Sequence, residues 1–177
     1  MKGVIFNVVQ EVVEDVFGPD AWDEIVRRSG ADGAYTSLGS YPDAELGSLV
    51  TAAAEVAGVT EPEALVLVGR KGFARLGGRH AELLDGADTW MDVLAQLDGI
   101  IHPEVQKIYP DAEVPSFRTT TGDRSMQLRY ESSRNLCPLA EGLILGMGDH
   151  FGTDLTVDHL ECVHRGDDSC VLEVVER

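Results

Sequence analysis

Three side chains in the second half of the chain have types and spacings that suit the binding of an anionic group. Tyr130, Ser132 and Arg134 are two residues apart, which on a β-strand places all three on one face. A guanidinium beside two hydroxyl donors can hold paired carboxylates or a phosphate. Taken alone, such spacing is more often the polar face of a solvated edge strand, so the anion site needs a second feature.

His102 supplies that second feature. It follows Leu97, Ile100 and Ile101 at the end of a strongly apolar helix face, where a lone histidine is most often a core residue with one hydrogen-bond partner. We call Tyr130, Ser132 and Arg134 the clamp residues, because together they could hold an anion. If a neutral imidazole lies opposite these residues, the pair suits a flat cofactor with a metal centre and two carboxylate arms. Haem fits this description.

The helix that carries His102 is predicted to begin at a capping box formed by Thr89 and Asp92 and to run toward Ile108. Before it, apolar residues recur with helical spacing, and the stretch 29–42 interrupts them as an irregular connector. Four helices are predicted in this first part, over residues 4–16, 20–28, 43–56 and 61–76.

After Pro115 the apolar and polar residues alternate, which is typical of β-strands. A helix is predicted over 138–151, between two hairpins. The strands of these hairpins are predicted over residues 116–119 with 126–130, and 155–163 with 170–175.

Together these elements predict an α+β fold within a single domain over residues 1–177. A helical N-terminal part, about residues 1–80, packs on a four-stranded antiparallel sheet with one crossing helix. The His102 helix and the sheet make up about residues 81–177. With 44% apolar and 25% charged residues, the composition is typical of one globular domain.

The chain is strongly acidic, with 14 Lys and Arg against 31 Asp and Glu and a formal net charge of −17. This charge repels phosphate backbones and anionic lipids, so neither nucleic acid nor a membrane is expected as a partner. No apolar run approaches the ~18 residues of a membrane span, the first residues do not form a signal peptide, and a cytoplasmic location is expected. No catalytic motif is present, so no enzyme activity is expected.

The residues around His102 resemble the haem-nitric oxide/oxygen binding (H-NOX) family, which includes the sensor region of soluble guanylate cyclases. Besides His102, the matching residues are Ile108-Tyr109-Pro110, Pro115-Ser116-Phe117-Arg118 and Tyr130-x-Ser132-x-Arg134, in the family's order and spacing. The match covers nearly the whole chain. It implies the H-NOX fold in a bacterial stand-alone member that binds haem b. By resemblance, His102 is the proximal iron ligand, Pro115 distorts the macrocycle, and Tyr130, Ser132 and Arg134 hold the propionates.

A single histidine ligand leaves the sixth iron position open, so a diatomic gas can bind there. Bound oxygen needs a hydrogen-bond donor, whereas nitric oxide and carbon monoxide do not. In the oxygen-binding members of the family a tyrosine lies five residues beyond the clamp arginine, where this chain has Leu139. We therefore predict a sensor of nitric oxide and carbon monoxide that excludes oxygen. An apolar distal wall is completed by Leu143, Ile5 and Val9, and the alternative donors are Asn7, Gln10 and the connector tyrosines.

The resemblance also predicts how the signal leaves the site. Nitric oxide weakens the bond from His102 to the iron, so its release would relax the strain imposed at Pro115 and move the helical part against the sheet part. The chain carries no output domain, so a separate partner protein is expected. Bacterial relatives commonly act on histidine kinases or cyclic-di-GMP enzymes.

A second metal site is predicted near the C-terminus. Cys137, Cys162 and Cys170 are the chain's only cysteines, and His159 precedes the second of them by three residues. Three thiolates and an imidazole form a closed tetrahedral set, typical of structural zinc, and a subset of the same family resembles this pattern. His164 is the alternative nitrogen ligand, and buried, unrelated cysteines are the alternative interpretation. Because zinc thiolates oxidise, the alternative function is a haem-independent redox sensor using this Cys3His zinc site.

Overall fold

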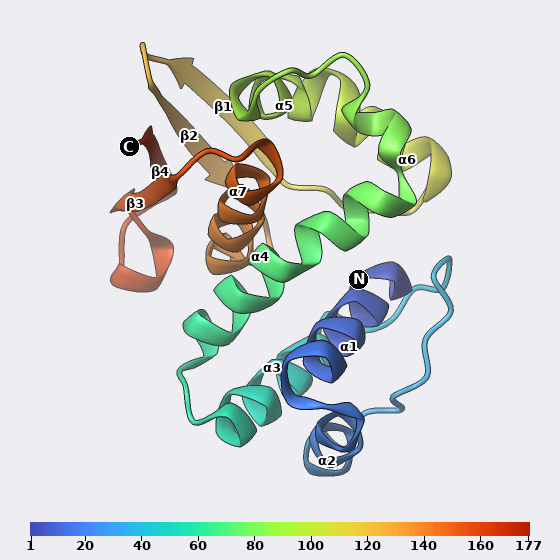
Figure 1. Cartoon of the computed structure of the whole chain (residues 1–177). Helices are drawn as coiled ribbons and strands as arrows, with labels where there is room; N and C mark the ends of the chain where they lie inside the picture. Colours follow the sequence, from blue (N-terminus) through green and yellow to red (C-terminus); the bar gives the residue numbers. More distant parts are fainter.

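The computed structural model describes residues 1–177 as two groups of elements joined by one long helix (Figure 1). The first group is α1 (Gly3–Phe17), α2 (Pro19–Ser29) and α3 (Asp43–Ala57), and the joining helix is α4 (Glu61–Arg79). The helices and turns of the second group are η1 (Ala81–Leu84), α5 (Trp90–Gln96), η2 (Leu97–Ile101), α6 (His102–Ile108), α7 (Cys137–Phe151) and η3 (Val163–Arg165). Its strands are β1 (Ser116–Thr121), β2 (Ser125–Glu131), β3 (Leu155–Glu161) and β4 (Cys170–Glu176).

The four strands form one antiparallel sheet in the order β1-β2-β4-β3. The helix α7 connects the two hairpins and packs on one face of the sheet, where alternate strand residues such as Leu128, Leu172 and Val174 are fully buried. The predicted α+β fold, with helices and a four-stranded antiparallel sheet crossed by one helix, is confirmed. None of the helices has both the length and the apolar character needed to cross a membrane.

Two hydrophobic cores hold these groups together. One core lies among α1, α2 and α3 and centres on Phe6, Ile25 and Leu49. The other lies between the sheet, α5 and α7 and includes Trp90. The helix α4 connects them, because it contributes Val68 to the first core and residues such as Phe73 to the second.

The helices α4 and α7 approach each other at backbone distance. A Cβ atom built on Gly142 of α7 would lie 2.2 Å from the carbonyl oxygen of Val66 in α4, and one on Gly146 would lie 2.3 Å from that of Arg70. Glycine is therefore required at this crossing, since any side chain there would push the two helices apart.

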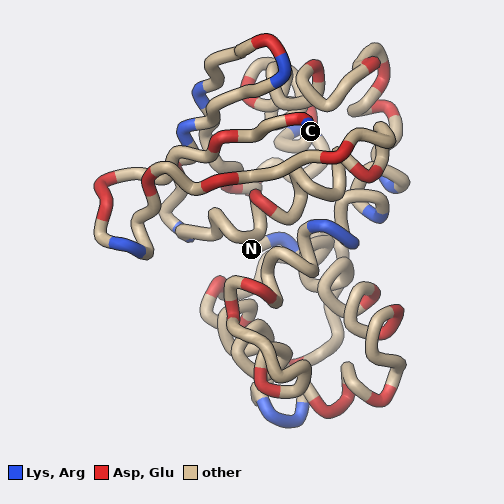
Figure 2. Tube along the Cα trace, turned by 60° about the vertical axis from the view of Figure 1, so that its left-hand side comes forward, with Lys and Arg blue, Asp and Glu red and all other residues tan.

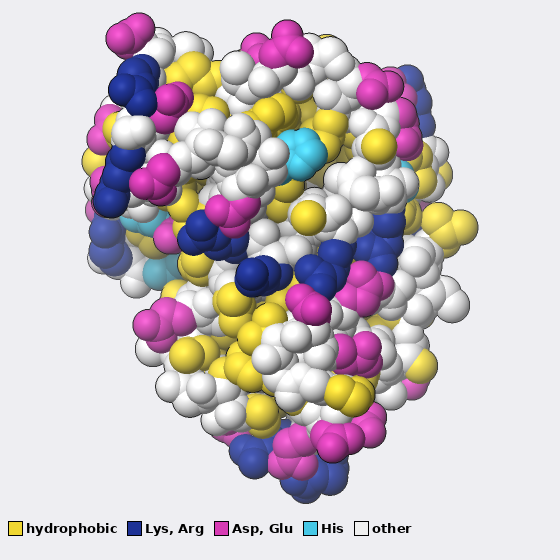
Figure 3. Space-filling view, in the orientation of Figure 1, with side chains coloured by type: hydrophobic (Ala, Val, Ile, Leu, Met, Phe, Trp, Pro, Cys, Tyr) yellow, Lys and Arg dark blue, Asp and Glu magenta, His cyan; other side chains and the backbone are white.

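Acidic side chains are spread over both groups (Figure 2). Some of the Lys and Arg side chains form a band across the middle of the face seen in Figure 3, over α4, and others lie at its left edge and lower end. Ion pairs made by this helix reach both of its neighbours. Arg70 pairs with Asp149 of α7 at 2.7 Å, and Arg75 pairs with Asp15 of α1 at 3.1 Å. The band therefore contributes to attaching α4 to both groups.

Several local predictions agree with the structure and others do not. The capping box of Thr89 and Asp92 is present, and residues 30–42 are irregular as predicted. The helix predicted to follow the box is present from Trp90 to Ile108, but its middle part, η2, is a wide π turn that lies between α5 and α6. The third strand ends at Glu161 rather than at residue 163, where η3 begins, and α4 continues to Arg79.

Candidate functional site

His102 is the first residue of α6, and its side chain is only 14% exposed. Its Nδ1 lies 3.2 Å from Oδ1 of Asp98, one turn earlier. Burial lowers the pKa of His102, against the opposing effects of the Asp98 carboxylate and the Pro115 carbonyl. Burial thus favours the neutral imidazole, which is the form that binds a metal.

Asp98 is a site residue that the sequence reasoning missed. Its Oδ2 accepts a hydrogen bond from the backbone N–H of Phe117 at 2.8 Å and one from the Ser116 hydroxyl at 3.2 Å. One carboxylate thus joins the His102 ring to the start of β1. The signal was available, because an acid four residues before a histidine on a helix lies on the same face.

Phe117 lies between His102 and Tyr130. Its ring centroid is 5.9 Å from that of His102 and 5.4 Å from that of Tyr130. Tyr130 comes from β2, which pairs directly with β1, so the sheet places the phenol on the same side as the imidazole. Two of the residue types singled out in the sequence are therefore brought into one site.

The three clamp residues do not share a strand face, and this expectation is wrong. The strand β2 ends at Glu131, so only Tyr130 belongs to it. The Ser132 hydroxyl accepts from the backbone N–H of Arg134 at 3.2 Å, and Asn135 adopts a left-handed conformation with φ 51°. Such local hydrogen bonds to the backbone compete with the sheet ladder and turn the chain.

The turn nevertheless keeps the clamp residues together. The Tyr130 hydroxyl accepts from the backbone N–H of Leu136 at 3.1 Å, and burial raises the pKa of Tyr130. The phenol, the Ser132 hydroxyl and the Arg134 guanidinium thus all belong to one short segment that ends where α7 begins.

Arg134 already binds carboxyl groups from elsewhere in the chain. Its side chain is 14% exposed, and its Nε donates to Oδ2 of Asp43 at 2.8 Å. A second ion pair, 3.0 Å long, joins it to Glu113, whose backbone carbonyl also accepts from the guanidinium. A groove of about 450 Å³ lies beside this cluster, between α3, the start of α4 and the turn. The Arg134 guanidinium thus binds carboxylates in this structure, and these carboxylates belong to the chain itself.

Comparison with known proteins identifies the family to which the chain belongs. The family model described as "Haem-NO-binding" matches residues 2–159. The chain belongs to this H-NOX family. A crystal structure of an H-NOX protein from S. oneidensis in the Fe(II)NO ligation state has a TM-score of 0.93 at 31% identity, with 100% of this chain and 99% of that one covered.

Two further H-NOX structures are similar over the whole of this chain. The solution structure of the IWP-051-bound H-NOX from Shewanella woodyi, in the Fe(II)CO state, has a TM-score of 0.82 at 33% identity and is covered to 95%. The unliganded Fe(II) H-NOX protein from K. algicida has a TM-score of 0.86 at 28% identity and is covered to 97%. Both matches support an H-NOX fold.

The predicted distal wall of this H-NOX domain comes from two helices. Val9 of α1 is buried in the first core, and Ile5 and Leu139 pack against that core. Leu143, one turn after Leu139 on α7, packs against the second core. Three of these side chains thus belong to the first core or pack against it, and Leu143 packs against the second. Pro115, partly buried, comes directly before β1, which links it to the His102 side of the site.

The alternative polar donors of the sequence analysis bond to other groups. The Asn7 amide donates to the Ser37 hydroxyl at 3.1 Å, and that of Gln10 donates to Glu14 at 2.8 Å. Among the connector tyrosines, Tyr35 donates to a carboxylate of α3 at 2.6 Å. Asn7, Gln10 and Tyr35 thus each donate to a group of their own. The Tyr41 hydroxyl accepts from the backbone N–H of Thr36 at 2.9 Å and lies 3.4 Å from the Thr36 hydroxyl.

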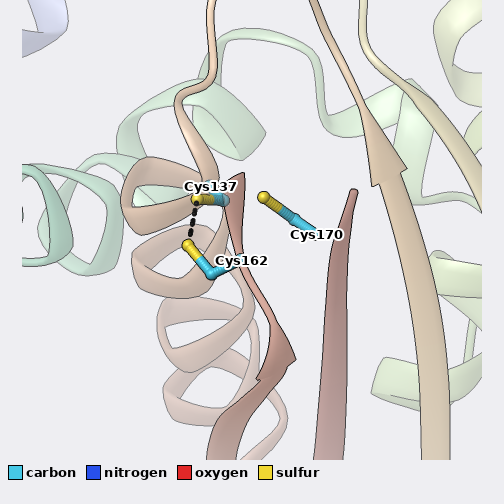
Figure 4. Close-up of side chains that lie close together, drawn as sticks. All are labelled: Cys137, Cys162 and Cys170. Atoms are coloured by element: carbon cyan, nitrogen blue, oxygen red, sulfur yellow. Dashed lines mark hydrogen bonds between the residues drawn. The ribbon is translucent and has the colours of Figure 1, made fainter. Parts of the chain in front are cut away.

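The three cysteines of this H-NOX domain come together at one end of the sheet, where their side chains point toward one another (Figure 4). Their sulfur atoms all lie within 4.8 Å of one another, and Cys137 and Cys162 are 3.7 Å apart. All three are buried and unpaired by disulfides. Burial opposes ionisation of Cys162, but the backbone N–H of His164 and the His159 ring lower its pKa to about 7.

The two candidate histidines differ in their positions. His159 Nε2 lies 2.9 Å from Glu141, while the same ring lies beside the Cys162 thiol. His164 Nε2 donates to the carbonyl of Asn135 at 2.7 Å. The structure therefore gathers the three thiols, and neither imidazole belongs to the set of ligand atoms within 4.8 Å.

Proposed function

We propose that this H-NOX domain is a haem-based sensor that binds nitric oxide and carbon monoxide and excludes oxygen. Bound haem b supplies an iron atom with one free coordination position for a diatomic gas. The observation that carries the proposal is the position of a buried, neutral imidazole at His102 on one side of Phe117. On the other side of Phe117, Tyr130 begins the segment whose hydrogen-bond donors can bind an anion. We propose that residues 1–177 work as one domain in this function.

The donor set fits haem. Because Asp98 engages Nδ1 of His102, Nε2 is the nitrogen that would be free to bind the iron. Tyr130, Ser132 and Arg134 supply hydroxyl and guanidinium donors suited to two propionates, and Arg134 already holds carboxylates in this segment. In this proposal Pro115, which comes directly before β1, would distort a bound macrocycle.

Oxygen exclusion follows from the chemistry of the opposite wall. Ile5, Val9, Leu139 and Leu143 carry no hydrogen-bond donor in their side chains, and the polar alternatives nearby are engaged elsewhere. An oxygen ligand with partial negative charge therefore lacks stabilisation there, whereas nitric oxide and carbon monoxide do not depend on it.

For the output, we propose that gas binding frees His102 and shifts the helical group against the sheet group. The partner that senses this change is a separate signalling protein, a histidine kinase or a cyclic-di-GMP enzyme. Nitric oxide is expected to change the partner's activity, and His102→Gly supplemented with free imidazole is expected to abolish that response while haem stays bound.

The experiment is an absorption spectrum of the haem-loaded ferrous protein under nitrogen, air, carbon monoxide and nitric oxide. We expect changes with the last two gases and none with air. His150→Ala is a matched control for His102→Gly, because His150 is an exposed histidine at the end of α7. A stable spectrum of an oxygen complex would contradict the selectivity, and unchanged haem ligation in His102→Gly would contradict the site.

We also propose that Cys137, Cys162, Cys170 and His159 hold a zinc ion. The specific support is the approach of three buried sulfur atoms within 4.8 Å, together with the His159 ring beside Cys162. Zinc analysis of protein purified without added metal tests this. The family match favours a haem sensor over a haem-independent redox sensor, for which protein that retains no haem would be expected.

A further inference from the structure

We propose that Asp98 is the residue that positions His102 as the ligand of the haem iron. We also propose that Asp98 connects His102 to the sheet through hydrogen bonds. This inference rests on the proposed function, since it concerns how the chain orients the imidazole that binds the iron. It adds a residue outside the clamp and the distal wall and assigns it two separate tasks.

The first task is to fix the imidazole. With Oδ1 of Asp98 3.2 Å from Nδ1 of His102, the proton of the neutral ring resides on Nδ1, where it donates to the carboxylate. The lone pair is then on Nε2. A carboxylate behind a metal-binding histidine fixes the tautomer and the ring orientation and strengthens the ring as a ligand.

The second task is to hold β1. Oδ2 of the same carboxylate accepts from the Phe117 N–H and from the Ser116 hydroxyl. These are the first two residues of the strand, directly after Pro115. Any displacement of the His102 ring is thus transmitted through Asp98 to the strand start, and through β1–β2 pairing to Tyr130.

The Asp98 carboxylate makes these contacts and forms no ion pair with a Lys or Arg side chain. No Lys or Arg lies within ion-pair distance of its carboxylate, and the neutral His102 ring is the one basic side chain in contact with it. Most other acids near the site do pair with a cation, for example Glu104, which lies on α6 next to Lys107. Asp98 is therefore not part of a general surface network.

The backbone between the two residues has a geometry that suits this role. The N–H of His102 donates to the carbonyl of Leu97, five residues back, so the turn is wider than in an α-helix. Single π turns of this kind are rare in helices and are frequent at functional sites. Here the wide turn contains Asp98 and ends at the residue before His102.

The test compares Asp98→Ala and Asp98→Asn with Glu104→Gln, which changes charge equally on the same helix. Asn preserves the shape of the side chain. However, if its oxygen accepts from Phe117, its NH2 group faces His102 and disfavours the Nδ1–H tautomer. The readouts are the iron–histidine stretching frequency by resonance Raman spectroscopy of the unliganded ferrous protein and the rate of haem transfer to apomyoglobin.

We expect both Asp98 variants to lower the stretching frequency and to lose haem faster by on the order of 10-fold, the lower end of the range for removal of such a partner. Glu104→Gln should match the wild type. An unchanged frequency in Asp98→Asn would overturn the inference, and because that side chain is isosteric, a folding defect in the alanine variant does not affect the decision. If His102→Gly also left the frequency unchanged, the proposed site itself would be wrong.

Discussion

The α4–α7 crossing gives the sharpest prediction about stability. Gly142→Ala would place a methyl group 2.2 Å from the Val66 carbonyl oxygen and 2.9 Å from the Gly69 Cα, both of them backbone atoms. Ordinary carbon contacts are about 3.5 Å, so the two helices would have to separate by roughly 1 Å. Neither backbone can rotate away as a flexible side chain would.

The magnitude follows from two opposing effects. Overpacking of this kind costs up to about 3 kcal/mol. Alanine in place of glycine inside a helix stabilises the helix by about 1 kcal/mol. We therefore expect the free energy of unfolding to fall by about 2 kcal/mol. For a chain of this length, that loss lowers the Tm by about 4–8 °C.

The assay is thermal unfolding by circular dichroism, with Gly47→Ala as the matched control. Gly47 is an exposed glycine inside α3, and a Cβ there would meet nothing within 4 Å. The same substitution should therefore stabilise the protein by about 0.5–1 kcal/mol. If Gly142→Ala unfolds at the wild-type temperature or above, the close helix crossing is not present in solution and the reasoning fails.

Three further substitutions test the rest of the molecule. Leu139→Tyr should give a ferrous haem protein with a stable oxygen spectrum in air because it adds a hydroxyl donor, whereas Leu139→Phe should not. Cys170→Ser should purify with less than half the zinc of the wild type, measured by atomic absorption; equal zinc contents would remove this thiol from the site. The Arg70 hydrogen bond lowers the pKa of Asp149, so its contribution of about 0.5 kcal/mol exists above the unfolded pKa of about 3.9 and disappears as the pH falls through the lower folded value. Urea unfolding of Asp149→Asn and wild type should therefore differ at pH 7 and converge near pH 3, and a difference that persists at pH 3 would contradict this assignment.

The helices and strands could be predicted where the residues that determine them lie close together in the sequence. The Thr89 capping box and the alternation of β2 about Leu128 depend on residues only a few positions apart, and both are present. The end of β2 also depends on local contacts, but Ser132 could satisfy its hydroxyl in a strand or in a turn. In the structure the Ser132 hydroxyl accepts from the N–H of Arg134, and Asn135 adopts a left-handed conformation. Both features belong to a turn rather than to a strand.

The site was less predictable because its partners are distant in sequence. His102 could be singled out from its type and its place on an apolar helix, but the π turn before it accompanies bonds from Asp98 to β1, 19 residues later. Arg134 pairs with Asp43, 91 residues away, a contact that no local pattern indicates. Spacing therefore indicated which side chains could form a site, and tertiary contacts determine how each of them is held.

Through these distant contacts, the two sides of the site are attached to different groups of elements. On one side, Asp98 attaches His102 to β1, within the second group of elements. On the other, Arg134 attaches the clamp to Asp43, at the start of α3 in the first group. A propionate that binds Arg134 would compete with Asp43 for the same N–H donors, so ligand binding at the clamp and the contact between the groups are coupled.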